Sequence, residues 1–200
     1  MTNSLPVILL VGGAGLRMGA ESGDLPKHLL DIGGRPMLWH VMRLYAYFGH
    51  THFLFPLGQR GDAFRRYFLE YEALTGEPVF TVGTPELRAP TLASELDWHI
   101  TLFDAGIKTR KGARVRIAAE RIDSTTFFVT YGDGIGDVDI KRLLAFHRSH
   151  GKLATLTAAP SPSKFGEISF KADQEVDFIE KSQIGEGWII GSFFVLEPKA

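Results

Sequence analysis

The hydrophobic pattern at the N-terminus predicts a buried strand, a long loop and then a helix. Residues 5–11 form a short and nearly continuous apolar run, which is typical of a strand covered on both faces of a parallel sheet. Residues 12–26 are rich in glycine and polar side chains, and Pro36 suits the first turn of a helix that runs to about Phe48. The apolar face of that helix carries Met37, Val41, Leu44 and Tyr45.

The alternation of strand and helix continues along the chain. Residues 52–57 are strand-like, and residues 61–74 have the spacing of an amphipathic helix that Gly76 ends. Residues 78–82 have the composition of another strand. Strands that alternate with helices in this way predict a parallel sheet with helices on its faces.

The middle of the chain repeats the pattern once more. Residues 117–121 look helical, and residues 125–130 are rich in β-branched and aromatic side chains, as in a buried strand. Asp137 is a candidate N-cap for a helix that reaches His150, with Asp139 in the positive first turn of that helix.

The pattern changes after residue 153, because no long helical pattern separates the remaining strands. These strand-like segments are residues 153–158, 167–170, 176–180 and 189–196. We therefore expect a single domain over residues 1–200 of the α/β class. Its mostly parallel, Rossmann-like sheet is flanked by helices and has a mixed β region toward the C-terminus.

Composition and charge narrow the classes of function. The 22 basic and 23 acidic residues leave a net charge of −1, so no general positive field favours nucleic acid as a partner. The absence of cysteine removes disulfides, thiolate metal sites and thiol nucleophiles. The apolar run near the N-terminus is too short for a signal peptide or a membrane span, so we expect a cytoplasmic protein without a membrane partner.

The glycine-rich segment after the first strand is a candidate anion site. Several backbone N–H groups of such a loop can point into one concavity, which phosphate oxygens can approach closely. Arg17 and Lys27 flank the loop and suit a triphosphate, whereas Met18 stands where the dinucleotide-binding motif needs a glycine. A glycine-rich turn with two solvated cations is the alternative. The segment consists of Leu10, Val11, Gly12, Gly13, Ala14, Gly15 and Leu16.

An aspartate between two glycines follows the predicted strand at residues 125–130. Asp133 would lie at the carboxyl end of that strand, where open α/β sheets bind ligands. Mg²⁺ binds few carboxylates and completes its coordination with phosphate oxygens and water, so Asp133 is a candidate magnesium ligand. A calcium loop is excluded because Ile135 stands where an oxygen ligand is required, and a simple turn residue is the alternative.

Together these motifs resemble the sugar-1-phosphate nucleotidyltransferase superfamily, and within it the glucose-1-phosphate cytidylyltransferases. Each segment alone is weakly specific, but their order and spacing together are specific, and the segments span nearly the whole chain. The segments that carry the resemblance are residues 12–18, 26–27, 32–40, 98–106, 130–134, 165–166, 180–181 and 191–196. The fold that the resemblance implies is the nucleotide-diphospho-sugar transferase type of Rossmann-like sheet.

The resemblance implies a reaction and a set of site residues. A sugar 1-phosphate, with glucose 1-phosphate favoured, attacks the α-phosphorus of a nucleoside triphosphate, with CTP favoured, and pyrophosphate leaves in an Mg²⁺-dependent step. Arg17, Lys27 and Asp133 are the implied catalytic residues, and Asp133 is the metal ligand. The nucleotide-binding set adds Leu10, Val11, Gly12, Gly13, Ala14, Gly15, Leu16, Lys111, Gly112 and Gly132. The sugar-phosphate set is Gly166, Glu180, Lys181 and Gly191.

Several residues depart from the pattern of the resembled family, and the departures leave other functions open. These residues are Leu16, His28, Lys111, Ala113, Ser182 and Ile190. The family also continues beyond the point that matches Ala200, to a C-terminal section with a second metal-binding aspartate. The open alternatives are the same reaction with another base or sugar phosphate, or a nucleotide-binding regulatory module with impaired catalysis.

The remaining histidines and aromatic residues are assigned no chemistry. His147 and His150 lie three residues apart on a predicted helix, where two solvated imidazoles are expected on a surface face. The aromatic side chains at helical spacing are expected in the core or in an interface, and a homo-oligomer is expected. These residues are Trp39, Tyr45, Phe48, Tyr67 and Phe68.

Overall fold

A computed structural model of the chain describes residues 4–12, 25–71, 98–160, 167–170, 176–179 and 188–199. The strands are β1 (Val7–Leu10), β2 (Asp31–Ile32), β3 (Arg35–Pro36), β4 (His52–Leu57), β5 (His99–Asp104), β6 (Phe127–Tyr131), β7 (Ala154–Pro160), β8 (Glu167–Phe170), β9 (Val176–Ile179) and β10 (Trp188–Leu196). The helices are the 3-10 helix η2 (Lys27–Leu29) and the α-helices α1 (Met37–Tyr47), α2 (Gly61–Leu69), α4 (Lys111–Ala119) and α5 (Ile140–His150).

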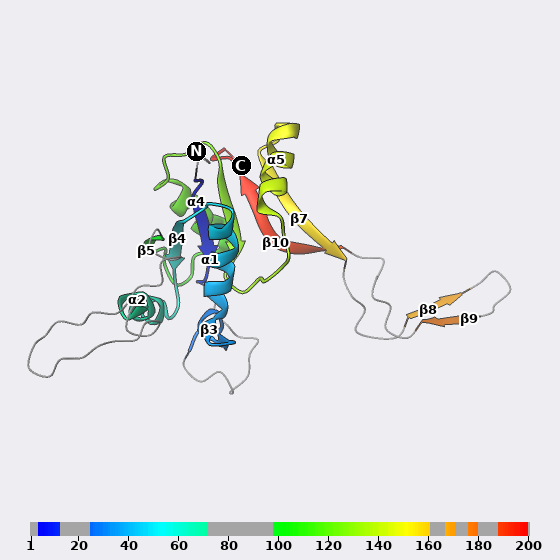
Figure 1. Ribbon diagram of the computed structural model, residues 1–200, viewed down its shortest axis with the longest axis horizontal. Coiled ribbons are helices and arrows are strands. Elements are labelled where there is room, and N and C mark those ends of the chain that lie inside the picture. Colours follow the sequence, from blue (N-terminus) through cyan, green and yellow to red (C-terminus); the bar gives the residue numbers. More distant parts are fainter. Residues whose placement is uncertain are drawn as a thin grey trace, which may run out of the picture.

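Within the described residues, six strands form the central sheet, in the order β5-β4-β1-β6-β10-β7 (Figure 1). β5, β4, β1 and β6 are parallel, whereas β10 runs antiparallel to both β6 and β7. The α/β fold with a mixed C-terminal region is therefore confirmed. The chain builds the sheet outward from β1 through β4 to β5, and then crosses to β6 on the other side of β1. The strand order thus reverses between β1 and β6, which is where such sheets bind ligands.

The two faces of the sheet follow from the alternation of side chains along β1. Val7 and Leu9 belong to a core that α1, α2 and α5 cover, whereas Ile8 packs with Ala118 of α4 on the opposite face. In Figure 1 α1 crosses the front of the sheet. Because β1 is buried on both sides, it reads as an uninterrupted apolar run in the sequence.

Helix α1 confirms the predicted helix, with Pro36 as the residue before its first turn. The predicted apolar face is wrong at two positions, because Leu38 and Met42 are buried, whereas Met37 and Leu44 are only partly buried. Val41 and Tyr45 are buried as expected, and Tyr45 packs against Phe128 and Phe193 at ring distances of 5.3 and 6.2 Å.

Three predicted boundaries differ from the structure. The helix expected at 117–121 is α4, which begins six residues earlier at Lys111 and ends at Ala119. Helix α2 ends at Leu69, short of the predicted end at residue 74. The strand expected at 78–82 lies outside the described residues. After β1 and β4, the next parallel strand that the structure describes is β5, where the hydrophobic pattern predicted no strand.

Helix α5 corrects two expectations. Asp139, and not Asp137, is its N-cap, because the Oδ1 atom of Asp139 accepts a hydrogen bond of 2.9 Å from the backbone N–H of Arg142. His147 is 2% exposed and not solvated, since this face of α5 packs against β7. Its Nδ1 atom lies 2.8 Å from the hydroxyl of Thr155, and the Nε2 atom of His150 lies 2.7 Å from the same hydroxyl.

Two small antiparallel sheets accompany the central one in the part of the chain that the structure describes. β2 pairs with β3 just before α1. The strands predicted at 167–170 and 176–180 are β8 and β9, which pair with each other in a sheet of their own (Figure 1). Within the described ranges, no helix is long and apolar enough to cross a membrane.

Candidate active site

The carboxyl ends of β1 and β6 lie side by side at the point where the strand order reverses. Leu10 is paired with Tyr131, and the backbone N–H of Gly132 donates a hydrogen bond of 3.3 Å to the carbonyl of Leu10. The segments that follow the two strands therefore begin next to each other. The start of the glycine-rich loop at Gly12 and the predicted metal ligand Asp133 thus share one edge of the sheet.

The side chains of Lys27 and Asp133 form an ion pair at this edge. The Nζ atom of Lys27 donates a hydrogen bond to Oδ2 of Asp133, although the two residues are 106 positions apart in the chain. Lys27 opens η2, whose turn is closed by a 2.8 Å hydrogen bond from the N–H of Leu29 to the carbonyl of Pro26. The side chains of Lys27 and Asp133 are 35% and 27% exposed, so an approaching ligand can reach both.

The ion pair keeps Asp133 ionised. Burial opposes the charged form, but the hydrogen bond and the positive charge of Lys27 outweigh this effect and lower the pKa of the Asp133 carboxyl. At neutral pH the site therefore presents one carboxylate beside one ammonium group.

The structure adds His28, to which sequence reasoning assigned no role in the site. Its side chain is 4% exposed and its ring lies 5.9 Å from the ring of Phe64. Burial lowers the pKa of His28 to about 4, against the raising influence of Asp133. The imidazole is therefore neutral at pH 7. The only sequence signal was that His28 departs from the pattern of the resembled family.

Gly132 leaves no room for a side chain between β1 and η2. A Cβ atom at this position would lie 2.6 Å from Cγ1 of Val11 and 3.0 Å from Cδ2 of His28. The close approach of these groups allows Asp133 to leave β6 directly toward Lys27. A glycine is thus required here for packing, and not for an unusual backbone conformation.

Lys111 and Gly112 lie at the N-terminus of α4, on the opposite face of the sheet from η2. The Nζ atom of Lys111 lies 4.3 Å from the centre of the Tyr131 ring, which places this cation beside the end of β6. A Cβ atom at Gly112 would meet open space, so packing does not explain a glycine there.

Gly191 lies in β10 next to β7. A Cβ atom at Gly191 would lie 2.5 Å from Oγ1 of Thr157, and one at Gly134 would lie 2.7 Å from Cβ of Ser192. β10 therefore passes close to the loop that carries Asp133, and the sugar-binding role expected for Gly191 stays a prediction. The predicted residues Gly13, Ala14, Gly15, Leu16, Arg17, Gly166, Glu180 and Lys181 lie outside the described residues.

Arg114 holds together the loops beneath the site, and sequence reasoning did not select it. Its buried guanidinium donates five hydrogen bonds of 2.6 to 3.3 Å to backbone carbonyls, and it lies against the backbone of Gly12 and Gly58. The five acceptors are the carbonyls of Pro56, Leu57, Gly106, Ile107 and Thr109. Arg114 therefore links the carboxyl ends of β4 and β5 to the residue that starts the glycine-rich loop.

Replacing Arg114 with methionine should lower the free energy of unfolding by about 2–4 kcal/mol, because buried carbonyls lose their donors. Urea unfolding followed by circular dichroism measures the change. Arg116→Met is the matched control, because Arg116 is 74% exposed on the same helix and its one ion pair among the described residues is with the exposed Glu120 at 3.3 Å. The control should cost less than about 0.5 kcal/mol. Equal losses in the two variants would contradict the role given to Arg114.

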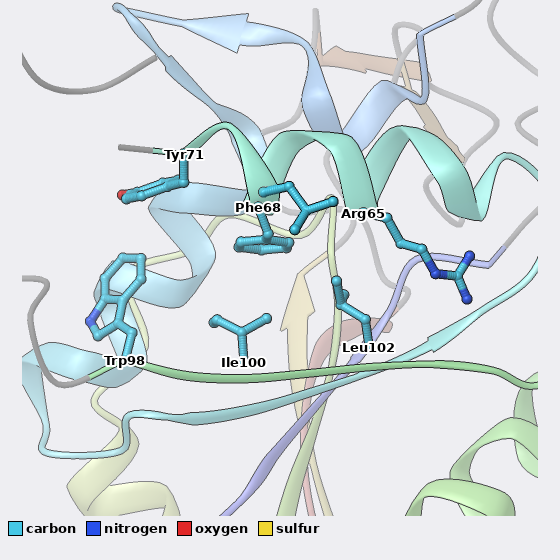
Figure 2. Close-up of a pocket in the computed structure, with 7 residues that line it drawn as sticks. Arg65, Phe68, Tyr71, Trp98, Ile100 and Leu102 are labelled. Carbon is cyan, nitrogen blue, oxygen red and sulfur yellow. The ribbon is translucent and has the colours of Figure 1, made fainter. Parts of the chain in front are cut away.

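An apolar cavity of about 500 Å³ lies away from this edge, between α2 and β5. Trp98, Ile100 and Leu102 face Phe68 and Tyr71 across it, as Figure 2 shows. Arg65 borders the cavity and is paired with Asp62 and Asp104 at 3.2 and 3.1 Å. None of the predicted site residues lines it, and its apolar walls do not suit a triphosphate.

Comparison with known protein families places the chain among nucleotide-transferring proteins. Residues 6–190 match the family model described as nucleotidyl transferase. The chain is 36% identical to the glucose-1-phosphate cytidylyltransferase of Salmonella typhimurium over 195 residues, which cover 97% of this chain and 76% of that protein. It is 35% identical to a probable glucose-1-phosphate cytidylyltransferase of Bacillus subtilis, with 98% and 76% covered.

Solved structures show the same fold at lower sequence identity. HddC from Yersinia pseudotuberculosis, complexed with GMP-PN, superposes with a TM-score of 0.64 at 20% identity, over 98% of this chain and 77% of that chain. The UTP-bound UGPase of Acinetobacter baumannii superposes with a TM-score of 0.67 at 16% identity, over 98% of this chain and 75% of that chain.

Proposed function

Since this chain belongs to the nucleotidyl transferase family, we propose that it transfers CMP from CTP to a sugar 1-phosphate, with glucose 1-phosphate as the reference acceptor. The products are a CDP-sugar and pyrophosphate. The observation that carries the proposal is the Lys27–Asp133 pair at the edge where β1 and β6 end. A cation and a carboxylate that both reach the ligand-binding edge of an α/β sheet suit a metal-bound triphosphate.

The reaction needs no nucleophile from the protein. An oxygen of the sugar phosphate forms a bond to the α-phosphorus of the triphosphate, the bond from that phosphorus to the bridging oxygen breaks, and pyrophosphate carries away the electron pair. Both reactants are anions, so the protein has to reduce their repulsion and align them. Proton transfer by a protein base is not required, and the ring of His28, which is 4% exposed, is not accessible to the substrates.

The residues present fit a divalent metal ion, which the family generally uses, and we propose Mg²⁺. Asp133 would hold it, because its carboxylate is ionised and accessible. In the described part of the chain no group of three or more acidic, histidine or cysteine side chains is arranged to hold a metal. A site with one protein carboxylate suits Mg²⁺ when the phosphates of the substrate supply further ligands. When bound, the ion would neutralise phosphate charge.

Besides the metal ion, positively charged side chains would neutralise and hold the phosphates of the two substrates. Lys27 would shift its hydrogen bond from Asp133 to the phosphates of the nucleotide, and Arg17 would bind the same phosphates. Lys181, next to Glu180, would hold the phosphate of the sugar. Lys111, Gly112 and Gly132 would border the nucleotide, and Gly166 and Gly191 the sugar. These roles extend the resemblance to this chain and remain proposals.

The choice of CTP rests on the names of the relatives, three of which are called cytidylyltransferases. Pyrophosphate release with each of the four nucleoside triphosphates, Mg²⁺ and glucose 1-phosphate tests this choice. We expect the kcat/KM for CTP to exceed that for ATP, GTP and UTP by at least about tenfold, the discrimination that a few base contacts provide. A faster reaction with another triphosphate would reassign the base. Tight binding of CTP without release on any acceptor would indicate a regulatory module.

Three further expectations stay predictions. We propose that residues 1–200 act as one catalytic domain, that its copies associate, and that the reaction takes place in the cytoplasm. A CDP-sugar made there would supply sugar residues for polysaccharide synthesis. Analytical ultracentrifugation measures the association directly.

A further inference from the structure

An exposed apolar row borders the site on the side of β10. Trp188 and Ile190 at the start of this strand are 73% and 57% exposed, and Leu156 of β7 is 53% exposed. Large exposed apolar side chains that gather beside a polar site mark a surface that meets a ligand or a partner.

Strand directions place this row at the same edge as Asp133. Since β10 runs antiparallel to both β6 and β7, the carboxyl end of β7 lies at the edge where β6 ends. Ile190 is paired with Ala158 and Trp188 with Pro160, both in that end of β7. The contact between Ser192 and Gly134 then brings the start of β10 next to the loop that carries Asp133.

The apolar row lies on one face of β7 and β10. Paired residues of antiparallel strands face the same side, so Ile190 shares a face with Ala158, and Phe194 shares that face with Leu156. The ring of Phe194 lies 5.9 Å from that of Tyr131, which continues the row toward the end of β6. Ile189 is paired with Ala159 and faces the opposite side, although it is also 50% exposed.

The two sides of Asp133, the side of α4 and the side of β7 and β10, differ in their charged residues. On the flank of α4, Lys108, Arg110 and Lys111 are all exposed within four residues of sequence. On the other flank, β7 and β10 contain no charged residue. A triphosphate is drawn to the basic flank, which leaves the apolar flank for the other reactant.

On the basis of the proposed function, we infer that Trp188 and Ile190 contact the sugar ring of the acceptor. We further infer that the site prefers a deoxy sugar 1-phosphate, which lacks the hydroxyl group that would face Ile190. An isoleucine side chain offers no hydrogen bond, so a hydroxyl placed against it loses its water partners without replacement. An apolar wall rejects an added hydroxyl by roughly ten- to a hundredfold, whereas a wall built to bind that hydroxyl rejects the deoxy compound by about ten-thousandfold.

The test compares kcat/KM for glucose 1-phosphate with kcat/KM for each of its monodeoxy analogues. At least one analogue should exceed glucose 1-phosphate by roughly tenfold or more. Ile190→Asn should shift this ratio toward glucose 1-phosphate by about tenfold, because the amide can bond to the hydroxyl. Ile189→Asn is the matched control and should leave the ratio unchanged, and thermal unfolding checks that both variants fold. Ile190→Ala should keep the preference for the deoxy compound, since it adds no polar group.

The outcomes separate the two levels of the proposal. If glucose 1-phosphate is turned over faster than every monodeoxy analogue, or if Ile189→Asn shifts the ratio as much as Ile190→Asn, the inference is wrong and nucleotidyl transfer stands. If no sugar 1-phosphate is turned over with any nucleoside triphosphate, both the proposed function and this inference are wrong.

Discussion

Replacing Asp133 with asparagine is expected to lower kcat for pyrophosphate release by at least about a hundredfold, as does the loss of one preorganised electrostatic group in other enzymes. Asparagine keeps the size of the side chain and can still accept a hydrogen bond from Lys27, but it lacks the charge that holds a divalent cation. The reaction should also require a higher metal concentration for half-maximal rate.

The control for this variant is Asp137→Asn, in the same loop between β6 and α5. Asp137 is exposed and does not cap α5. The kcat of the Asp137→Asn variant should therefore remain within about twofold of the original, because surface substitutions away from a site have small effects. A kcat near the original value in Asp133→Asn would remove Asp133 from the metal site.

Replacing Lys27 with methionine is expected to lower kcat/KM for CTP by at least about a hundredfold. Methionine retains much of the length of the lysine side chain but provides no charge for the phosphates. Lys27→Arg should recover part of this loss, because arginine keeps the charge but presents it as a planar fork. Steady-state kinetics at saturating metal and acceptor measure both variants.

The free energy of unfolding of Lys27→Met shows whether a loss of activity arises from the missing charge or from a less stable fold. The Lys27–Asp133 pair is about one-third exposed, and such pairs contribute roughly 1 kcal/mol or less to the free energy of unfolding. Lys141→Met, on the exposed side of α5, is the matched control and should leave kcat/KM unchanged. Normal turnover in Lys27→Met, or an equal loss in Lys141→Met, would contradict the role of Lys27.

The strands at the centre of the sheet were predictable because they are buried on both faces. β1 is an apolar run throughout, and β4 and β6 are mostly apolar, whereas β5 lies at the edge of the described sheet and has exposed residues, His99 and Asp104, at its two ends. Helix α4 was placed too late because its first turns carry Lys111, Gly112 and the inward-facing Arg114, which hide the helical spacing of apolar residues. The periodicity of a helix indicates its buried face only when that face is apolar.

The charged residues of the candidate site were predictable, but the interactions that hold the site in place were not. Asp133 follows the end of one recognisable strand, and Lys27 flanks the glycine-rich loop after another. The rule that ligands bind at the carboxyl ends of strands brings both residues to one edge of the sheet. Arg114 could not be found in this way, because its partners are backbone carbonyls, which leave no signature in the sequence. The environment of His147 likewise depends on the packing of α5 against β7.

The most direct test of nucleotidyl transfer is phosphorus NMR of the purified chain incubated with CTP, Mg²⁺ and glucose 1-phosphate. We expect CDP-glucose and pyrophosphate to form in equal amounts, and neither to form when the acceptor is omitted. CDP and inorganic phosphate as products, pyrophosphate release without the acceptor, or unchanged CTP would contradict nucleotidyl transfer to the sugar phosphate.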